Sequence, residues 1–183
     1  MREIVIVVGK TGQGKTTWTK QYLNNLKRII ILDPLDEYRG QEYYELSQMI
    51  EHMQRYKMYC VKSSAIDDLD DLCKISQSAG NLHFVIEEAQ RSIPPRANLP
   101  ESVKDLIYRG RHQNVSIIAV AQRASSINIA LRSQFTKIIA FWQTEPADLT
   151  WLDNVSGYPV SEYNFKPYSY LEITPFGVTE KNT

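Results

Sequence analysis

Short apolar runs alternate with longer, mixed segments along most of the chain. Continuous runs of β-branched and apolar residues are typical of buried strands, and they lie at Ile4–Val8, Ile29–Leu32, Met58–Val61, His83–Ile86, Val115–Ala121 and Ile138–Phe141. Between most of them, helical patterning predicts helices over Lys15–Leu26, Glu42–Arg55, Ile66–Ser76 and Glu101–Arg109. Because the strand candidates are continuously apolar, we predict a mainly parallel central sheet with helices on both faces.

The last part of the chain has a different composition. Tyr158–Val178 is rich in Tyr, Pro and Gly, which predicts a β-hairpin or an extended cap. No repeat, linker or low-complexity block interrupts the sequence, and a length of 183 residues fits one domain. We therefore expect a single α/β domain over 1–183, with a core over about 3–155 and a short β-rich tail over 156–183.

Charge, cysteine spacing and the lengths of the apolar runs give no sign of a generally basic protein, a cysteine metal or redox site, or a membrane span. Lys and Arg together number 21, as do Asp and Glu, so any contact with nucleic acid must come from a local patch. Cys60 and Cys73 lack the spacing of metal ligands or of a redox pair, which favours two buried thiols in a reducing compartment. No apolar run approaches the roughly 20 residues that span a bilayer, and no signal-peptide pattern is evident. We expect a soluble protein.

A glycine-rich loop links the first strand candidate to the first helix candidate. It fits G-x-x-x-x-G-K-[ST] as Gly9, Lys10, Thr11, Gly12, Gln13, Gly14, Lys15 and Thr16, in the strand-loop-helix context that this phosphate-binding motif requires. Glycines allow successive backbone N–H groups to turn toward phosphate oxygens. Lys15 is the expected partner of the β- and γ-phosphates, Thr16 is the expected Mg²⁺ ligand, and the helix N-terminus adds positive charge.

Polar side chains follow the fourth and fifth strand candidates. Glu87 and Glu88 come directly after His83–Ile86, and Gln122 follows Val115–Ala121. These positions belong to the edge of the sheet where α/β proteins bind ligands. In hydrolytic phosphate-loop enzymes the first acid orders Mg²⁺ and the second activates water, while a neutral amide can contact the γ-phosphate. A solvated strand end is the alternative interpretation, and the phosphate loop favours the functional one.

Several arginines have two possible roles. Arg109 and Arg111 flank a glycine just before the fifth strand candidate, and Arg123 follows it. Such arginines are either solvated charges at a helix end or arginine fingers that reach the nucleotide of a neighbouring subunit. The sequence leaves open which of the three would act as the finger.

The segments GKTGQGKTT, LDPLDEY, VIEEAQ and GRHQNVSIIAVAQR together resemble the HerA/FtsK superfamily of ring-forming, DNA-pumping ATPases. Within this superfamily, the small size of the chain makes it most similar to the genome-packaging ATPases of tailless icosahedral viruses with an internal membrane. The resemblance covers about Ile4 to Asp153 and implies a P-loop NTPase fold of the ASCE/RecA-like type. Asp33 matches an acidic residue that commonly follows the second strand in this family, and no role is assigned to it.

The resemblance also implies a set of functional residues. ATP would be contacted by Gly12, Gln13, Gly14, Lys15, Thr16 and Thr17, and Mg²⁺ would be ordered by Thr16 and Glu87. Glu88 would be the catalytic base, Gln122 the sensor and Arg111 the finger. Glu87 is a departure, because the family mostly has Asp at this position and the extra methylene lengthens the reach to the metal.

The same resemblance implies partners and a location. We expect self-association into a ring, a pentamer or a hexamer, with double-stranded DNA bound through backbone contacts. Arg91 and Arg96, on either side of Pro94–Pro95, would form the pore loop, although an ordinary proline-rich surface loop is the alternative. A capsid vertex or membrane protein is a further expected partner, in the host cytoplasm or at the packaging vertex of the virion.

Two other classes of enzyme share the phosphate loop. Lys10 stands five residues before Lys15, which is the spacing of the signature lysine in ParA/MinD partition ATPases. Those proteins generally have Gly where this chain has Thr11, and the adjacent pair of Glu87 and Glu88 favours a ring motor. A small nucleoside or nucleotide kinase would leave Gln122 unexplained, and an arginine-rich lid is not evident. A GTP-dependent switch would need an Asn-Lys-x-Asp base reader, and none occurs.

Overall fold

One sheet organises the chain. The computed structural model describes residues 2–182. Its strands are β1 (Ile4–Val8), β2 (Arg28–Leu32), β3 (Gln41–Glu42), β4 (Tyr59–Ser63), β5 (Leu82–Ile86), β6 (Val115–Ala121), β7 (Lys137–Ala140), β8 (Ser169–Thr174) and β9 (Gly177–Asn182). Its helices are α1 (Lys15–Leu23), α2 (Leu46–Arg55), α3 (Leu69–Ala79), α4 (Ala89–Ser92), α5 (Glu101–Arg109), α6 (Ile129–Gln134) and α7 (Pro146–Ser156).

The strands lie in the order β3-β4-β2-β5-β6-β1-β7-β8-β9. All pairs from β3 to β7 are parallel, and β8 and β9 add two antiparallel strands at one edge. β6 lies between β1 and β5, with Val7 opposite Val120 and Ile86 opposite Ala119. The carboxyl ends of these three central strands therefore meet at the same edge of the sheet.

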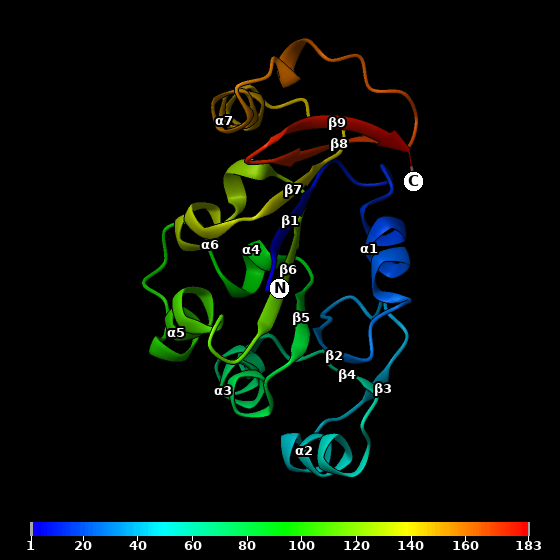
Figure 1. The fold of residues 1–183 in the computed structure, drawn as a ribbon, viewed down its shortest axis with the longest axis vertical. Coiled ribbons are helices and arrows are strands. Elements are labelled where there is room, and N and C mark those ends of the chain that lie inside the picture. Colours follow the sequence, from blue (N-terminus) through cyan, green and yellow to red (C-terminus); the bar gives the residue numbers. More distant parts are fainter. Residues whose placement is uncertain (1, 183) are drawn as a thin grey trace.

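Helices cover the two faces of the sheet unequally. Figure 1 shows α3, α5 and α6 on one face and α1 on the other. Alternate residues of each strand face the two layers: Ile6, Phe84 and Ile117 belong to the larger core, while Val85 packs in the smaller core with Trp18 of α1. The predicted three-layer α/β arrangement with a mainly parallel sheet is confirmed.

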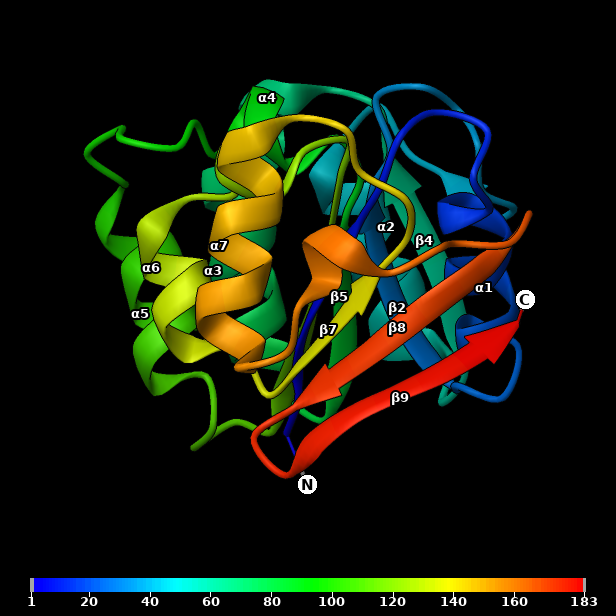
Figure 2. The ribbon, with the colours of Figure 1, turned by 90° about the horizontal axis from the view of Figure 1, so that it is seen from above.

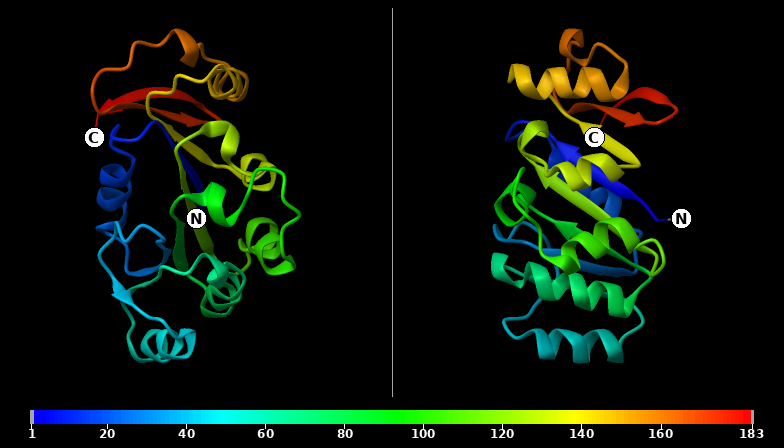
Figure 3. Two further views of the ribbon diagram at one scale, coloured as in Figure 1. Left: turned by 180° about the vertical axis from the view of Figure 1, so that it is seen from behind. Right: turned by 90° about the vertical axis from the view of Figure 1, so that its left-hand side faces the viewer.

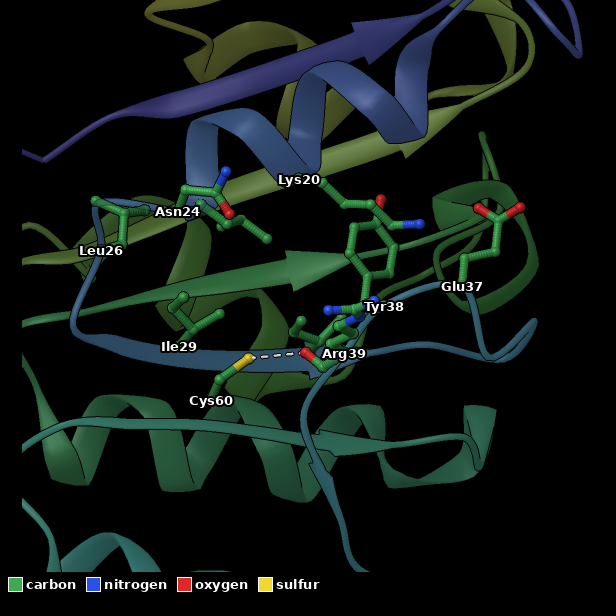
Figure 4. A pocket seen from close by; sticks show the side chains of 10 residues that line it. Lys20, Asn24, Leu26, Ile29, Glu37, Tyr38, Arg39 and Cys60 are labelled. Carbon is green, nitrogen blue, oxygen red and sulfur yellow. Dashed lines mark hydrogen bonds between the residues drawn. The ribbon is translucent and has the colours of Figure 1, made fainter.

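The smaller layer leaves an open cleft beside α1, with a volume of about 580 Å³. Leu23, Ile29 and Cys60 form part of its apolar wall. Figure 4 shows Lys20 and Tyr38 at this cleft, with the Lys20 ammonium 5.7 Å from the centroid of the Tyr38 ring. Tyr38 also belongs to the smaller core, and its loop leads toward the carboxyl edge of the sheet.

Several predicted boundaries are wrong by a few residues. The helix expected over 42–55 begins at Leu46, because the backbone of Gln41–Glu42 pairs with β4 as a short edge strand. The first helix ends at Leu23 rather than residue 26, and the third strand covers 59–63 rather than 58–61. Helices α4 and α7 were not predicted. Pro146 at the start of α7 and Gly157 after its end are the sequence signals that could have located that helix.

The tail forms a hairpin, one of the two predicted alternatives, and the hairpin covers 169–182 rather than 158–178. β8 pairs antiparallel with β7, and β9 pairs antiparallel with β8, which extends the sheet (Figure 2). Leu152 of α7 shares the larger core with Leu171 and Ile173 of β8. Figure 3 shows α7 beside the hairpin, so the end of the chain packs onto the core. Within residues 2–182, no helix is long and apolar enough to cross a membrane.

Candidate nucleotide site

The glycine-rich loop lies between β1 and α1 and packs against the end of β7. Gly9 has φ 155°, and a Cβ at this position would meet the Cβ of Phe141 at 2.4 Å. The backbone N–H of Lys10 donates to the Trp142 carbonyl across 3.0 Å. Gly12 has φ 81° and an added Cβ would meet nothing within 4 Å. Gly9 is thus required for packing, whereas Gly12 faces open space where a ligand can approach.

Lys15 is held over this loop. Its ammonium donates to the Lys10 carbonyl across 3.2 Å. Burial lowers the pKa of Lys15, while the nearby carboxylates of Glu87, Glu88 and Glu37 raise it. A positive charge is therefore concentrated at the mouth of the loop, opposite several negative groups.

The predicted site residues meet in one cavity of about 320 Å³. Its lining includes nearly all of them: Gly12, Gly14, Lys15, Thr16, Thr17, Glu87, Glu88 and Gln122. Gln13 lies outside this group and lines a neighbouring cleft. Glu37 and Tyr168 also line the cavity, although the sequence analysis did not predict a role for either.

Glu88 and Gln122 are in direct contact. The side-chain amide of Gln122 donates to Glu88 Oε1 across 3.0 Å, and the Gln90 amide donates to Glu88 Oε2. Glu88 is 8% exposed and has φ 48°, a left-handed conformation that is uncommon for a residue other than glycine. The backbone and two amides thus hold this carboxylate at the wall of the cavity.

Glu87 is more deeply buried and has a different partner. The Tyr38 hydroxyl donates to Glu87 Oε2. Burial raises the pKa of Glu87 to about 7, Glu37 and Glu88 add to the increase, and the Tyr38 hydrogen bond and Lys15 oppose it. The described residues around Glu87 therefore do not fully compensate the negative charge of its carboxylate.

The segment that follows β2 brings Glu37 and Tyr38 to the site. The Asp33 carboxylate accepts hydrogen bonds from the backbone N–H groups of Glu37 (3.0 Å) and Tyr38 (2.9 Å), and it lies 3.6 Å from Lys62 Nζ. Thr16 Oγ1 donates to Glu37 Oε2 across 2.8 Å. Asp33 thus positions the loop. In the sequence, the acidic LDPLDEY segment was the only signal that this loop belongs to the site. It did not show which of its side chains reaches the cavity.

The donor set fits Mg²⁺. Glu37, Glu87 and Glu88 line a cavity in which Lys15 is the one cationic side chain among the described residues, and carboxylate and hydroxyl oxygens are the ligands that Mg²⁺ prefers. Across residues 2–182, no three His, Cys, Asp or Glu side chains converge closely enough to hold a metal without help. Thr16 contacts Glu37 rather than Glu87, so Mg²⁺ held by Thr16 and Glu87 would share its coordination with phosphate oxygens and water.

The three candidate fingers lie at the two ends of β6, with one arginine at the end that carries Gln122 and two at the other end. Arg123 follows β6 beside Gln122, and its guanidinium donates to the buried Asp148 across 3.1 Å. Arg109 and Arg111 precede β6, a strand of 7 residues; at about 3.3 Å per residue this strand separates them from Gln122 by roughly 20 Å. Within one chain they are not brought to the cavity, so either could reach only the nucleotide of another copy.

Lys10 is already engaged within its own chain. Its ammonium lies 5.0 Å from the centroid of the Trp142 ring, a cation–π distance. The partition-ATPase alternative requires Lys10 to act across a dimer. The observed contact gives this lysine a structural role within the monomer and does not favour that alternative.

The fold and this site together define a P-loop ATPase. The profile of the family described as "ATPase family associated with various cellular activities (AAA)" matches residues 5–142, and the chain belongs to this family. No curated protein matches the sequence. Similarity to known proteins beyond the family therefore comes from solved structures.

Two of the similar structures are viral. The genome packaging NTPase B204 from Sulfolobus turreted icosahedral virus 2, in complex with AMPPCP, has a TM-score of 0.84 and 21% identity, covering 99% of this chain and 97% of that one. B204 from Sulfolobus turreted icosahedral virus, the DNA-packaging ATPase, has a TM-score of 0.75 and 17% identity over 98% and 97%. These matches confirm, at the level of the fold, the resemblance expected from the sequence.

A third similar structure comes from a conjugation system. The pCW3 conjugation coupling protein TcpA, in its monomer form with ATPγS, has a TM-score of 0.66 and 13% identity. The match covers 99% of this chain and 60% of that one. The present fold thus corresponds to one part of a larger protein in that case.

Proposed function

We propose that this ATPase translocates double-stranded DNA as a ring and packages a viral genome into a preformed capsid. The observation that carries the proposal is the contact between Glu88 and Gln122, opposite Lys15 in one cavity. A carboxylate that can accept a proton from water, next to an amide that can detect a terminal phosphate, is the arrangement that a hydrolytic motor needs. Similarity to a DNA-packaging ATPase supports the same function.

In the proposed reaction, the chain's own groups have separate tasks. Lys15 and the backbone N–H groups of the loop would hold the β- and γ-phosphates, and Glu88 would take a proton from the attacking water. Gln122 would donate to the γ-phosphate or to that water. Thr16 and Glu87 would hold Mg²⁺, which when bound would supply positive charge against the negative charge that develops during phosphoryl transfer.

Hydrolysis is connected to a basic segment by a short helix. α4 begins directly after Glu88, and beyond it the chain is anchored by Ile93 and Leu99, both buried. Arg96 lies between these anchors and is exposed, and Arg91 on α4 is exposed as well. A change at Glu88 would therefore be transmitted to two exposed guanidinium groups, which suit contacts with DNA phosphates. We propose residues 91–96 as the pore loop.

A ring would supply the arginine finger that one chain does not bring to its own cavity. Arg111 lies at the edge of the sheet away from its own cavity, so its role as finger requires a neighbouring copy, in a pentamer or a hexamer. A capsid vertex or membrane protein would hold such a ring in place, either in the host cytoplasm or at the packaging vertex of the virion. The neutral balance of charge fits a protein whose DNA affinity comes from several copies acting together.

The test combines ATP hydrolysis with the state of assembly. Double-stranded DNA should stimulate hydrolysis, Lys15→Ala should abolish it, and light scattering with an ATP analogue and DNA should detect a ring. The double variant Arg91→Ala and Arg96→Ala should lose most of the stimulation, whereas the control Arg55→Ala, an exposed arginine on α2, should retain it. A stable ATP-dependent dimer would favour a partition ATPase, and a monomer that phosphorylates a nucleoside would favour a kinase.

A further inference from the structure

A second cleft opens next to the phosphate cavity. It has a volume of about 330 Å³, and its lining includes Gly12, Gln13, Trp142, Phe165, Lys166 and Tyr168. Gly12 and Tyr168 line both spaces, so the cleft and the cavity meet at the glycine-rich loop. We call this space the base cleft.

The strand order gives a nucleotide one direction in which to extend. β5 and β6, which precede Glu88 and Gln122, lie on one side of β1, and β7 and β8 lie on the other side (Figure 1). Apart from the glycine-rich loop, the base cleft is formed by residues after β7 and before β8. A terminal phosphate that faces Glu88 and Gln122 places the rest of the nucleotide away from them. The base cleft is the described space that lies in that direction and continues from the phosphate cavity.

The two largest rings of the base cleft are exposed. Trp142 is 41% exposed and Tyr168 is 59% exposed, although rings of this size usually bury more of their surface. The Lys10 ammonium lies over the Trp142 ring, and its backbone N–H bonds the Trp142 carbonyl. Tyr168 has φ 60°, a left-handed conformation that is uncommon outside glycine. Exposed aromatic faces beside a phosphate site suit the flat surface of a nucleobase.

We propose that the base cleft binds the nucleobase of the substrate by stacking, and that it favours purines over pyrimidines while accepting adenine and guanine alike. This inference rests on the proposed nucleotide site. Gln13 and Lys166 are among the few polar side chains in the described lining, and no acidic residue contributes to it. A glutamine amide both donates and accepts hydrogen bonds, so it does not distinguish the two purines. A larger ring system gives a larger stacking area, which favours purines.

Calorimetry with Mg²⁺ and four ligands tests the proposal: ATP, GTP, CTP and inorganic triphosphate. Triphosphate has no base and reports on the phosphate cavity alone. In Tyr168→Ala the affinity for ATP and GTP should fall about tenfold or more, as expected for loss of an aromatic stacking partner. The affinity for triphosphate should fall by a much smaller factor, because Tyr168 is only one of the residues that line the phosphate cavity. Tyr168→Phe keeps the ring and should retain more affinity for ATP and GTP than Tyr168→Ala does. Tyr44→Ala, an exposed aromatic next to β3 at the far edge of the sheet, is the matched control.

Each outcome of these binding measurements either supports or contradicts the proposed base cleft. If Trp142→Ala, a second variant of the base cleft, also weakens ATP and leaves triphosphate unchanged, the proposal stands. If both aromatic variants bind ATP like the wild type, or lose ATP and triphosphate equally, the base does not occupy this cleft. A wild-type preference for ATP over GTP of more than a hundredfold would show readout by hydrogen bonds and overturn the stacking mode. Failure of the wild type to bind either ATP or triphosphate would overturn the proposed function itself.

Discussion

Gln122 donates its side-chain amide to Glu88 across 3.0 Å and joins the carboxyl ends of two neighbouring parallel strands. The Gln122 side-chain nitrogen lies at the cavity that Lys15 also lines. We expect a γ-phosphate or a water in the cavity to compete with Glu88 for this donor. Whether Gln122 bonds Glu88 would then depend on whether the terminal phosphate is present.

Replacement of Glu88 by Gln should separate binding from turnover. The amide keeps the shape of the side chain but cannot accept a proton from water, so we expect normal ATP affinity and a rate lower by roughly a hundredfold or more. Calorimetry and steady-state hydrolysis measure the two quantities. If Glu88→Gln is fully active and Glu87→Gln is inactive, the base and the metal-ordering acid have been assigned in reverse.

Replacement of Arg111 by Ala should reduce hydrolysis on the order of a thousandfold, the effect of a missing arginine finger, with little change in nucleotide affinity. Because Arg111 would act on a neighbouring copy, mixing Arg111→Ala with Glu88→Gln subunits should restore part of the DNA-stimulated rate. Each variant alone should remain nearly inactive.

Two controls make the mixing experiment specific. Arg109→Ala, which removes an arginine that pairs with Asp105 at 3.1 Å, should leave hydrolysis nearly unchanged. Native mass spectrometry should show that mixed oligomers form. Mixed oligomers without any recovered activity would make Arg111 an ordinary charge after the end of α5.

The buried Glu87 should make stability fall as pH rises when no nucleotide is present. Its pKa in the folded state is about 7, against an ordinary value of 4.5, so the folded protein binds more protons between these values than the unfolded chain does. The stabilising contribution is complete below about pH 4.5 and is lost as pH rises through about 7, by up to about 3 kcal/mol.

Urea unfolding at pH 5 and pH 8 measures this effect. The difference in free energy of unfolding between the wild type and Glu87→Gln should shift in favour of the variant at the higher pH. The control Glu51→Gln, an exposed position on α2, should follow the wild type at both values. Parallel behaviour of Glu87→Gln and the wild type would mean that Glu87 is ionised throughout this range.

Gly9→Ala should destabilise the fold by about 2 kcal/mol or more, because a Cβ would lie 2.4 Å from the Cβ of Phe141 in a backbone conformation that favours glycine. Gly157→Ala is the matched control. Gly157 also has a positive φ, but an added Cβ meets nothing within 4 Å, so its cost should be about 1 kcal/mol. Equal losses in thermal unfolding would show that β7 moves to accommodate the methyl group.

The sequence by itself determined the local units of this protein. The run of β-branched residues, the loop ending in Lys15 and the helix after it form one continuous segment, so their geometry follows from neighbouring residues alone. Glu87, Glu88 and Gln122 were located because a polar residue after a buried strand must emerge at the edge of the sheet. Composition and turn residues, which are also local signals, predicted a hairpin or an extended cap for the tail.

Only the tertiary structure decided which of these units meet. The insertion of β6 between β1 and β5 brings Gln122 to Glu88, and strand order depends on contacts between residues far apart in the chain. Glu37 and Tyr168 reach the site from a loop and from the tail, and no local pattern indicates where such segments pack. Arg111 was predicted to act on a neighbouring copy, and its position before β6, at the end of that strand away from Gln122, keeps it from its own cavity. Side-chain position across a sheet is set by packing of the whole chain, which local periodicity does not encode.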